Sequence, residues 1–173
     1  MPRFDRDARE TVRSARTAAI LDNARAVDPE RLLYALFERA DSHGATLAGD
    51  TITVDALRTA FDRANRRGGI SDSESELLAR MGVDVATLTD HVEREFGEGA
   101  LDPRAKGRKG SPGFTDDLRR ILYGALNEAR ELRSRRIGDG HLLLSALRQP
   151  GIAADVLIEL GLSYLEVRAR MAA

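Results

Sequence analysis

The fold is decided by the stretch "IGDGHLLLSALRQPGIAADVLIELGLSYLEVR", residues 137–168. Its apolar runs are interrupted at Pro150-Gly151 and at Gly161, and Pro and Gly are the residues that end helices. Ser163 and Glu166 have the spacing of a capping box, which opens a helix. The stretch therefore predicts three short helices: about 140–148 with Asp139 as N-cap, about 152–160, and one that begins at the capping box.

A longer helix is predicted immediately upstream. Thr115 is its expected N-cap, and Asp116 and Asp117 favour its first turn because a helix N-terminus attracts negative charge. One apolar stripe follows at spacings of three and four: Leu118, Ile121, Leu122, Ala125, Ala129 and Leu132. No segment shows sustained alternation of apolar and polar residues; "TITV" (51–54) is too short to count. The fold class predicted is all-α.

Composition narrows the class of protein. Hydrophobic content of 42% with 32% charged residues is typical of a globular protein, and a net charge of −1 gives no global attraction to nucleic acid or to an anionic membrane. The chain has no cysteine, and its first residues, "MPRFDRDARE", do not resemble a signal peptide. No apolar run approaches the roughly 20 residues of a membrane span. We therefore expect a cytoplasmic protein without membrane contact.

The chain also repeats itself. An offset of 110 residues aligns Phe4 with Phe114, Ala15 with Ala125, and Leu32-Leu33 with Leu142-Leu143. Further along, an offset of 79 aligns Met81-Gly82-Val83 with Leu160-Gly161-Leu162, so the first copy is predicted to contain an insertion of 31 residues, at about 40–70. The predicted domains are a first four-helix repeat over 1–96 with that insertion, a Gly-, Pro- and base-rich linker over 97–113, and a second repeat over 114–173.

With these motifs the chain resembles the double Clp N-terminal domain at the head of ClpA/ClpC-type AAA+ unfoldases. The family's helix start, Ile-Gly-Thr-Glu-His-Leu-Leu-Leu, corresponds to Ile137–Leu144 here. The resemblance implies two four-helix repeats related by a pseudo-twofold axis. It further implies a binding module for proteins or peptides (a Clp ATPase, adaptors or substrates) and for peptidic small molecules, with no catalysis of its own.

His141 begins one of the predicted helices, and its role has to be weighed. A metal site needs about three or four converging ligands, whereas His43, His91 and His141 lie in unrelated sequence contexts. The sequence also lacks a P-loop, G-x-S-x-G and H-E-x-x-H. We therefore predict a structural role for His141, no metal, no cofactor, no nucleotide binding and no enzymatic activity.

The resemblance implies two candidate phosphoarginine pockets, one in each copy. ClpC-like members of the family read the phosphate with a Thr after the Phe, and the guanidinium with the Glu before the His. The first copy has Asp5 in place of the Thr but keeps Glu30; the second copy keeps Thr115 but has Gly140 in place of the Glu. Because Asp5 repels a phosphate and Gly140 offers a guanidinium nothing, both pockets are predicted to be degenerate.

A second implied surface is a hydrophobic groove near the N-termini of the first helix of each copy. Its candidate residues are Phe4, Arg9, Val12, Phe114, Arg119 and Leu122. Phe and Arg are frequent anchors of peptide recognition, although both Phe side chains could equally pack each helix start onto the core. The alternative function is a nucleic-acid-associated regulator that uses the basic stretch "RAKGRKG" (104–110), which has no aromatic neighbour for base stacking.

Overall fold

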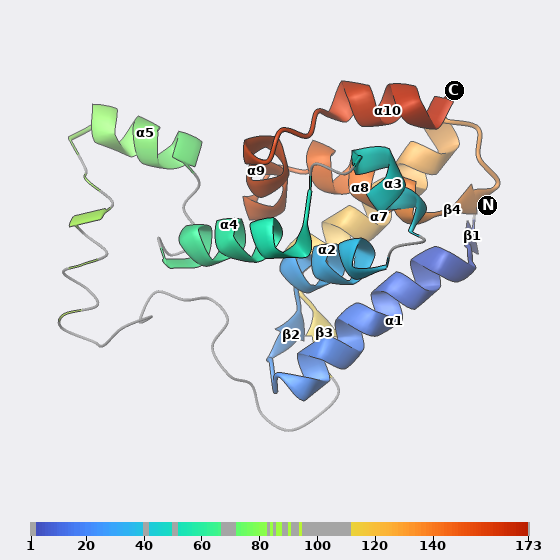
Figure 1. Ribbon diagram of the computed structural model, residues 1–173, viewed down its shortest axis with the longest axis horizontal. Helices are drawn as coiled ribbons and strands as arrows, with labels where there is room; N and C mark the ends of the chain where they lie inside the picture. The colour runs from blue at the N-terminus through green and yellow to red at the C-terminus, as the bar shows by residue number, and fades with distance from the viewer. Residues whose placement is uncertain are drawn as a thin grey trace.

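The computed structural model describes residues 3–39, 42–49, 52–66, 72–82 and 112–172, with isolated positions between 84 and 94. The described part is helical, as predicted (Figure 1). Its helices are α1 (Arg6–Leu21), α2 (Pro29–Glu38), α3 (His43–Ala48), α4 (Val54–Arg66), α5 (Asp72–Arg80), α7 (Asp116–Glu131), α8 (Asp139–Arg148), α9 (Ile152–Glu159) and α10 (Tyr164–Ala172).

Four two-residue strands, which the sequence did not predict, join the two halves of the chain. They are β1 (Arg3–Phe4), β2 (Ala26–Val27), β3 (Gly113–Phe114) and β4 (Arg136–Ile137). β1 pairs in parallel with β4, and β2 pairs in parallel with β3, so each ladder takes one strand from each half. At the offset of 110 residues, β1 corresponds to β3 and β4 corresponds to β2, so the two ladders are equivalent. A pseudo-twofold axis would exchange the strands in this way. Superposition of residues 4–37 on 114–147 stays a prediction.

Short polar side chains start the long helices. Asp5 Oδ1 accepts from Ala8 N at 2.8 Å at the start of α1, and Thr115 Oγ1 accepts from Leu118 N at 3.2 Å at the start of α7. At α8 the N-cap is Gly138, one residue before the predicted Asp139, so Asp139 is the first residue of the helix. Its side chain therefore does not cap α8 and instead accepts hydrogen bonds from Thr11 and Ser42.

The position of the additional chain, predicted at 40–70, can be compared with the packing of α3 and α4. α3 packs against α8 and α10, and α4 packs against α2 and α9. The offset of 110 continues through these helices, because Val54 and Tyr164 begin α4 and α10, and three pairs at this offset are buried: Leu47/Leu157, Ile52/Leu162 and Leu57/Val167. We infer that α3 and α4 are the counterparts of α9 and α10, and that the extra residues follow α4.

One hydrophobic core runs through both halves. Fully buried leucines of α2 and α8, among them Leu32, Leu33, Leu142 and Leu143, form its centre. α5 is drawn apart from this body in Figure 1. The predicted linker lies outside the described residues except for 112 and 113. Within the described ranges, no helix combines the length and the apolar character needed to cross a bilayer.

Candidate functional site

The two ladders rearrange the predicted phosphoarginine pockets. Asp5 N donates to Ile137 O at 3.0 Å, and Thr115 N donates to Val27 O at 2.9 Å. Asp5 therefore lies beside the second half, and Thr115 lies beside the loop that leads into α2. The assignment of Asp5 with Glu30 and of Thr115 with Gly140, each within one copy, is corrected by this crossing.

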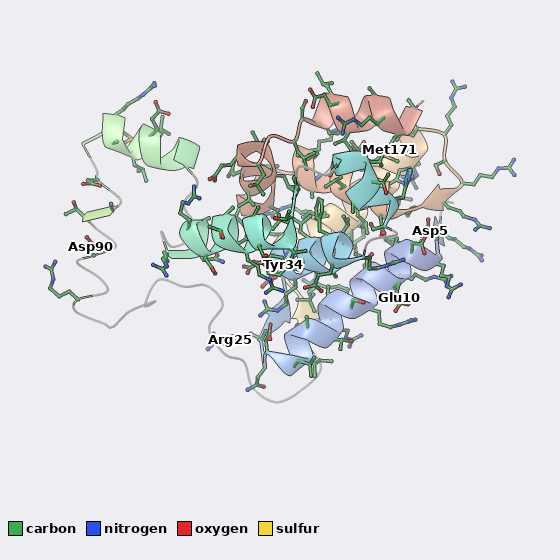
Figure 2. All side chains as sticks on the ribbon, in the orientation of Figure 1. Asp5, Glu10, Arg25, Tyr34, Asp90 and Met171 are labelled. Carbon is green, nitrogen blue, oxygen red and sulfur yellow. The ribbon has the colours of Figure 1, made fainter. Side chains whose placement is uncertain are left out.

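Gly140 is not an open pocket position. A Cβ atom on Gly140 would lie 2.7 Å from Leu47 Cδ1 and 2.9 Å from Met171 Sδ. Figure 2 shows Met171 on α10, close to α3. The space that a glutamate would need in a guanidinium site is thus filled by apolar side chains.

Glu30 is present, but its carboxylate is already engaged. Only 8% of the residue is exposed. Its Oε1 accepts from the Tyr34 hydroxyl at 2.9 Å, and its Oε2 accepts from Asn65 Nδ2 at 2.8 Å. One oxygen is held within α2 and the other by α4, so the fork that would bind a guanidinium beside Thr115 is committed to the fold.

The six residues of the predicted peptide groove are not gathered at one place. β1 precedes α1 and β2 follows it, so Phe4 in β1 and Phe114, paired with β2, lie at opposite ends of α1 (Figure 1). A helix of 16 residues is about 24 Å long. The two Phe side chains and the pair Val12 and Leu122 are partly buried against the core, whereas Arg9 and Arg119 are exposed.

The arginines of that set bind locally. Arg9 Nε donates to Asp5 O at 3.0 Å, and Arg119 donates to Asp116 at 2.9 Å. The partial burial supports the interpretation of Phe4 and Phe114 as staples of the helix starts. A recognition groove that uses both ends of α1 stays a prediction.

A different hollow, not found from the sequence, lies between α1, α2 and α4. It has a volume of about 300 Å³, and its polar lining is dominated by acids: Asp22, Glu30, Glu38 and Asp62, with Arg31, Arg58 and Tyr34. We call it the first groove. Figure 2 shows Tyr34 between α2 and α4. Burial raises the pKa of the Tyr34 hydroxyl above its usual range, and the nearby Glu30 and Asp62 carboxylates raise it further.

The two arginines of the first groove are held differently. Arg31 donates to Asp28 at 2.5 Å and to Asp22 at 3.0 Å, and its side chain is only 10% exposed. Arg58 donates to Glu38 at 2.9 Å, and its guanidinium carbon lies 4.6 Å from the centre of the Tyr34 ring. Arg58 is about half exposed. The first groove therefore contains one buried arginine and one surface arginine stacked on an aromatic face.

The corresponding hollow of the second half, the second groove, lies between α7 and α8. It measures about 380 Å³ and is lined by Gly124, Glu128 and Arg148, which are the counterparts of Ser14, Ala18 and Glu38 at the offset of 110. Glu128 is 1% exposed. It accepts from Arg148 at 3.0 Å, from the Tyr164 hydroxyl at 2.9 Å and from Arg168 at 3.3 Å.

Asp139 forms a polar link between the halves. Its Oδ1 accepts from the Thr11 hydroxyl and its Oδ2 from the Ser42 hydroxyl, each at 2.9 Å, and its side chain is fully buried. Burial raises the pKa of Asp139, while the two hydroxyl donors lower it. The Arg39 guanidinium lies 4.0 Å from Asp139 Oδ2. The carboxylate thus joins α8 to α1 and to the start of α3.

His141 has a structural contact. Its Nδ1 accepts from Gly138 N at 3.0 Å, which places the second nitrogen, Nε2, as a buried donor with no hydrogen-bond partner among the described residues. Burial lowers the pKa of His141. Within the described ranges, no group of three or more His, Asp or Glu side chains is placed to hold a metal ion; His91 lies outside those ranges.

Residues 113–173 match a protein-family model described as Clp repeat (R) N-terminal domain. The family model thus matches the second half of the described fold, α7 to α10. Over 98 residues, which are 56% of this chain, the sequence is 35% identical to the ATP-dependent Clp protease ATP-binding subunit ClpA homolog of Guillardia theta. Over the same length it is 34% identical to the chloroplastic ClpA homolog of Brassica napus. The aligned part is about a tenth (11%) of those relatives' length.

Solved structures extend the similarity to the whole fold. The N-terminal domain of the chaperone ClpD from Arabidopsis thaliana matches with a TM-score of 0.60 over 98% of this chain and 95% of that one, at 18% identity. A structure titled as a preliminary investigation of a malarial protein secretion system matches with a TM-score of 0.55 over 97% and 91%, at 15% identity. The fold of the chain is therefore similar to that of a Clp N-terminal domain.

Proposed function

We propose that this protein is a non-enzymatic binding module that recognises protein segments or peptidic ligands and modulates Clp-dependent proteolysis in the cytoplasm. The observation that carries the proposal is the match of the whole chain to a ClpD N-terminal domain, together with the Clp repeat at 113–173. Its partners would be a Clp ATPase, its adaptors or its substrates.

The geometry supports recognition by a preformed surface. Helices of both halves share one core, so the grooves beside α2 and α8 are held by packed elements rather than by loops. Sites on rigid elements bind with a smaller entropic cost of ordering than mobile loops do. Both grooves are hydrogen-bonded and charged, which suits polar protein segments better than an apolar small molecule.

The experiment that tests the proposal is a degradation assay with a purified ClpC-type unfoldase, its peptidase and a fluorescent substrate. Added in excess, the full chain should slow or redirect degradation in a dose-dependent way, while an equal amount of a helical protein of similar charge should not. A 15-residue peptide array should in parallel show selective binding. No effect in the assay and a blank array would overturn the proposal. Binding to nucleic acid that weakens steeply as the salt concentration rises would instead favour the alternative regulator, whereas ligand binding that survives moderate salt would speak against it.

A further inference from the structure

We propose that the first groove, between α1, α2 and α4, binds the unmodified arginine side chain of a partner protein segment, and that Arg58 occupies the guanidinium position in the free protein. This inference rests on the proposed function, because it names the chemistry of the segment that the module would recognise. The first groove shares Glu30 with the implied phosphoarginine pockets, but the guanidinium contacts argued here are those of Tyr34 and Glu38.

Charge supports a cationic ligand. Four carboxylates, those of Asp22, Glu30, Glu38 and Asp62, line the first groove against only two guanidinium groups. A cleft lined by an excess of one sign concentrates ions of the other sign. The groove therefore attracts a positive side chain and repels a phosphorylated one.

Arg58 shows which cation fits. Its guanidinium stacks on the Tyr34 ring at 4.6 Å and donates to Glu38 at 2.9 Å, so both a π-face and a carboxylate meet one planar cation. Arginine is suited to such a site because its guanidinium stacks on aromatic rings and pairs with carboxylates at the same time. Both Arg58 and Glu38 are about half exposed, and an exposed ion pair contributes little to stability, so an incoming arginine can displace Arg58.

A second observation points to a ligand in the same groove. Arg31 Nε is buried and has no hydrogen-bond acceptor among the described residues, although Arg31 lines the hollow. A buried donor that lacks an acceptor is costly, and a partner that supplies one gains free energy from it. The main-chain carbonyl beside a bound arginine is such an acceptor, and it reaches the buried Nε atom when the Arg31 side chain shifts. The groove thus offers acceptors for the side chain, and Arg31 holds a donor in reserve for the backbone of the same segment.

The second groove provides the contrast. Arg168, the counterpart of Arg58, is bound by the buried Glu128 and by Glu131. Ala18 occupies the position of Glu128 in the first half, and it lines the first groove. The first half therefore lacks the carboxylate that fixes the arginine in the second half, which leaves Arg58 at the surface and replaceable.

The test is an NMR titration of the 173-residue chain with the capped tripeptide acetyl-Gly-Arg-Gly-amide, followed through backbone amides of α1, α2 and α4. Two surface variants probe the groove: Arg58→Ala removes the internal competitor, and Glu38→Gln removes the carboxylate. Arg63→Ala is the matched control, because Arg63 lies on the same helix but pairs with Glu159. The ligand controls replace arginine by citrulline, which is neutral and of similar shape, and by phosphoarginine.

We expect Arg58→Ala to tighten binding by about twofold to fivefold, since an exposed cation–π contact must otherwise be broken. Glu38→Gln should weaken binding by about twofold to fivefold. Arg63→Ala should change it little, and citrulline should not bind.

The inference is overturned if Arg58→Ala leaves the affinity as Arg63→Ala does, if citrulline binds equally, if phosphoarginine binds this groove more tightly, or if the shifts map elsewhere. It is also overturned if no tripeptide binds. In each of these cases the proposed function survives provided that the peptide array shows selective binding, because other segments could use other surfaces.

Discussion

The two halves of the molecule begin with helices of equal length but bury their carboxylates in different places. α1 and α7 are both 16 residues long, and α2 and α8 are both 10. At equivalent positions, the first half has Ala18 and Glu30 where the second half has Glu128 and Gly140. Glu30 is held by Tyr34 and Asn65, whereas Glu128 is held by two arginines and Tyr164.

This difference decides which groove is available. In the second half the buried Glu128 draws Arg148 and Arg168 together, so the charges of the groove are paired with one another. In the first half the acid lies on α2 instead, and Arg58 remains at the rim. The same fold can thus keep one groove for stability and leave the other for binding. Four substitutions test whether the second groove is structural and how the two halves differ.

Gly140→Glu gives the second half the acid of the first half, and we expect it to destabilise the protein by about 3–5 kcal/mol, as an uncompensated buried charge does. The new side chain would have to displace Leu47 and Met171. Chemical denaturation measures the loss. Gly140→Ala, the control, adds only a methyl group and should cost much less. A stable Gly140→Glu protein would show that the start of α8 tolerates a buried carboxylate as the start of α2 does.

Asp139→Ala tests the link between the halves. The change leaves the Thr11 and Ser42 hydroxyls buried without their acceptor, so we expect a loss of about 2–3 kcal/mol in the free energy of unfolding. Asp117→Ala is the matched control, because it removes an acid from the first turn of α7 that is about half exposed. Equal effects of the two variants would mean that the buried link does not hold the halves together.

Glu128→Ala tests whether the second groove is structural. It removes the acceptor of Tyr164 and one carboxylate from two partly exposed arginines, and we expect a loss of about 1–2 kcal/mol. Glu131→Ala removes the other, exposed carboxylate from the same two arginines and should cost less. If Glu131→Ala were the more damaging change, the buried position of Glu128 would not be what organises the groove.

The sequence predicted the helices of the second half to within a residue or two, because Thr115, Pro150 and Gly161 are local signals that act on their own neighbours. We infer a different position for the insertion, because Gly82 and Gly161 both follow helices with positive φ, and such similar helix ends can be aligned even where their helices are not equivalent. The buried residues Leu47, Ile52 and Leu57 follow the offset of 110 residues throughout.

The candidate sites were harder to predict, because their geometry depends on which strands of the first half pair with which strands of the second half. Nothing in the local sequence shows that β1 pairs with β4 rather than with its own neighbour β2. The first groove was missed for a similar reason: Tyr34, Glu38 and Arg58 are ordinary residues on amphipathic helices until α2 and α4 bring them together. A signal was available in the paired positions Arg58 and Arg168, because the second half has Glu128 on its first long helix where the first half has Ala18.

The smallest expected effect concerns His141, whose counterpart at the offset of 110 is Arg31. Burial lowers the pKa of His141, although the Asp5 and Glu128 carboxylates oppose this, and His43 adds to it. The folded protein therefore binds fewer protons at this ring than the unfolded chain does. Stability from His141 is present above the unfolded pKa of about 6.5 and is lost as the pH falls below it, by at most about 1.4 kcal/mol per pH unit.

His141→Gln separates this titration from the cap, because a glutamine at this position can still accept from Gly138 N. Urea denaturation at pH 7.5 and 5.5 should show the wild type losing stability that the variant retains, with similar values for both at pH 7.5. Groups such as Asp139 titrate in both proteins, so the difference between them isolates His141. Parallel loss in the two proteins would show that the His141 ring is protonated without cost in the folded state, and that the start of α8 is no more sensitive to pH than the start of α2.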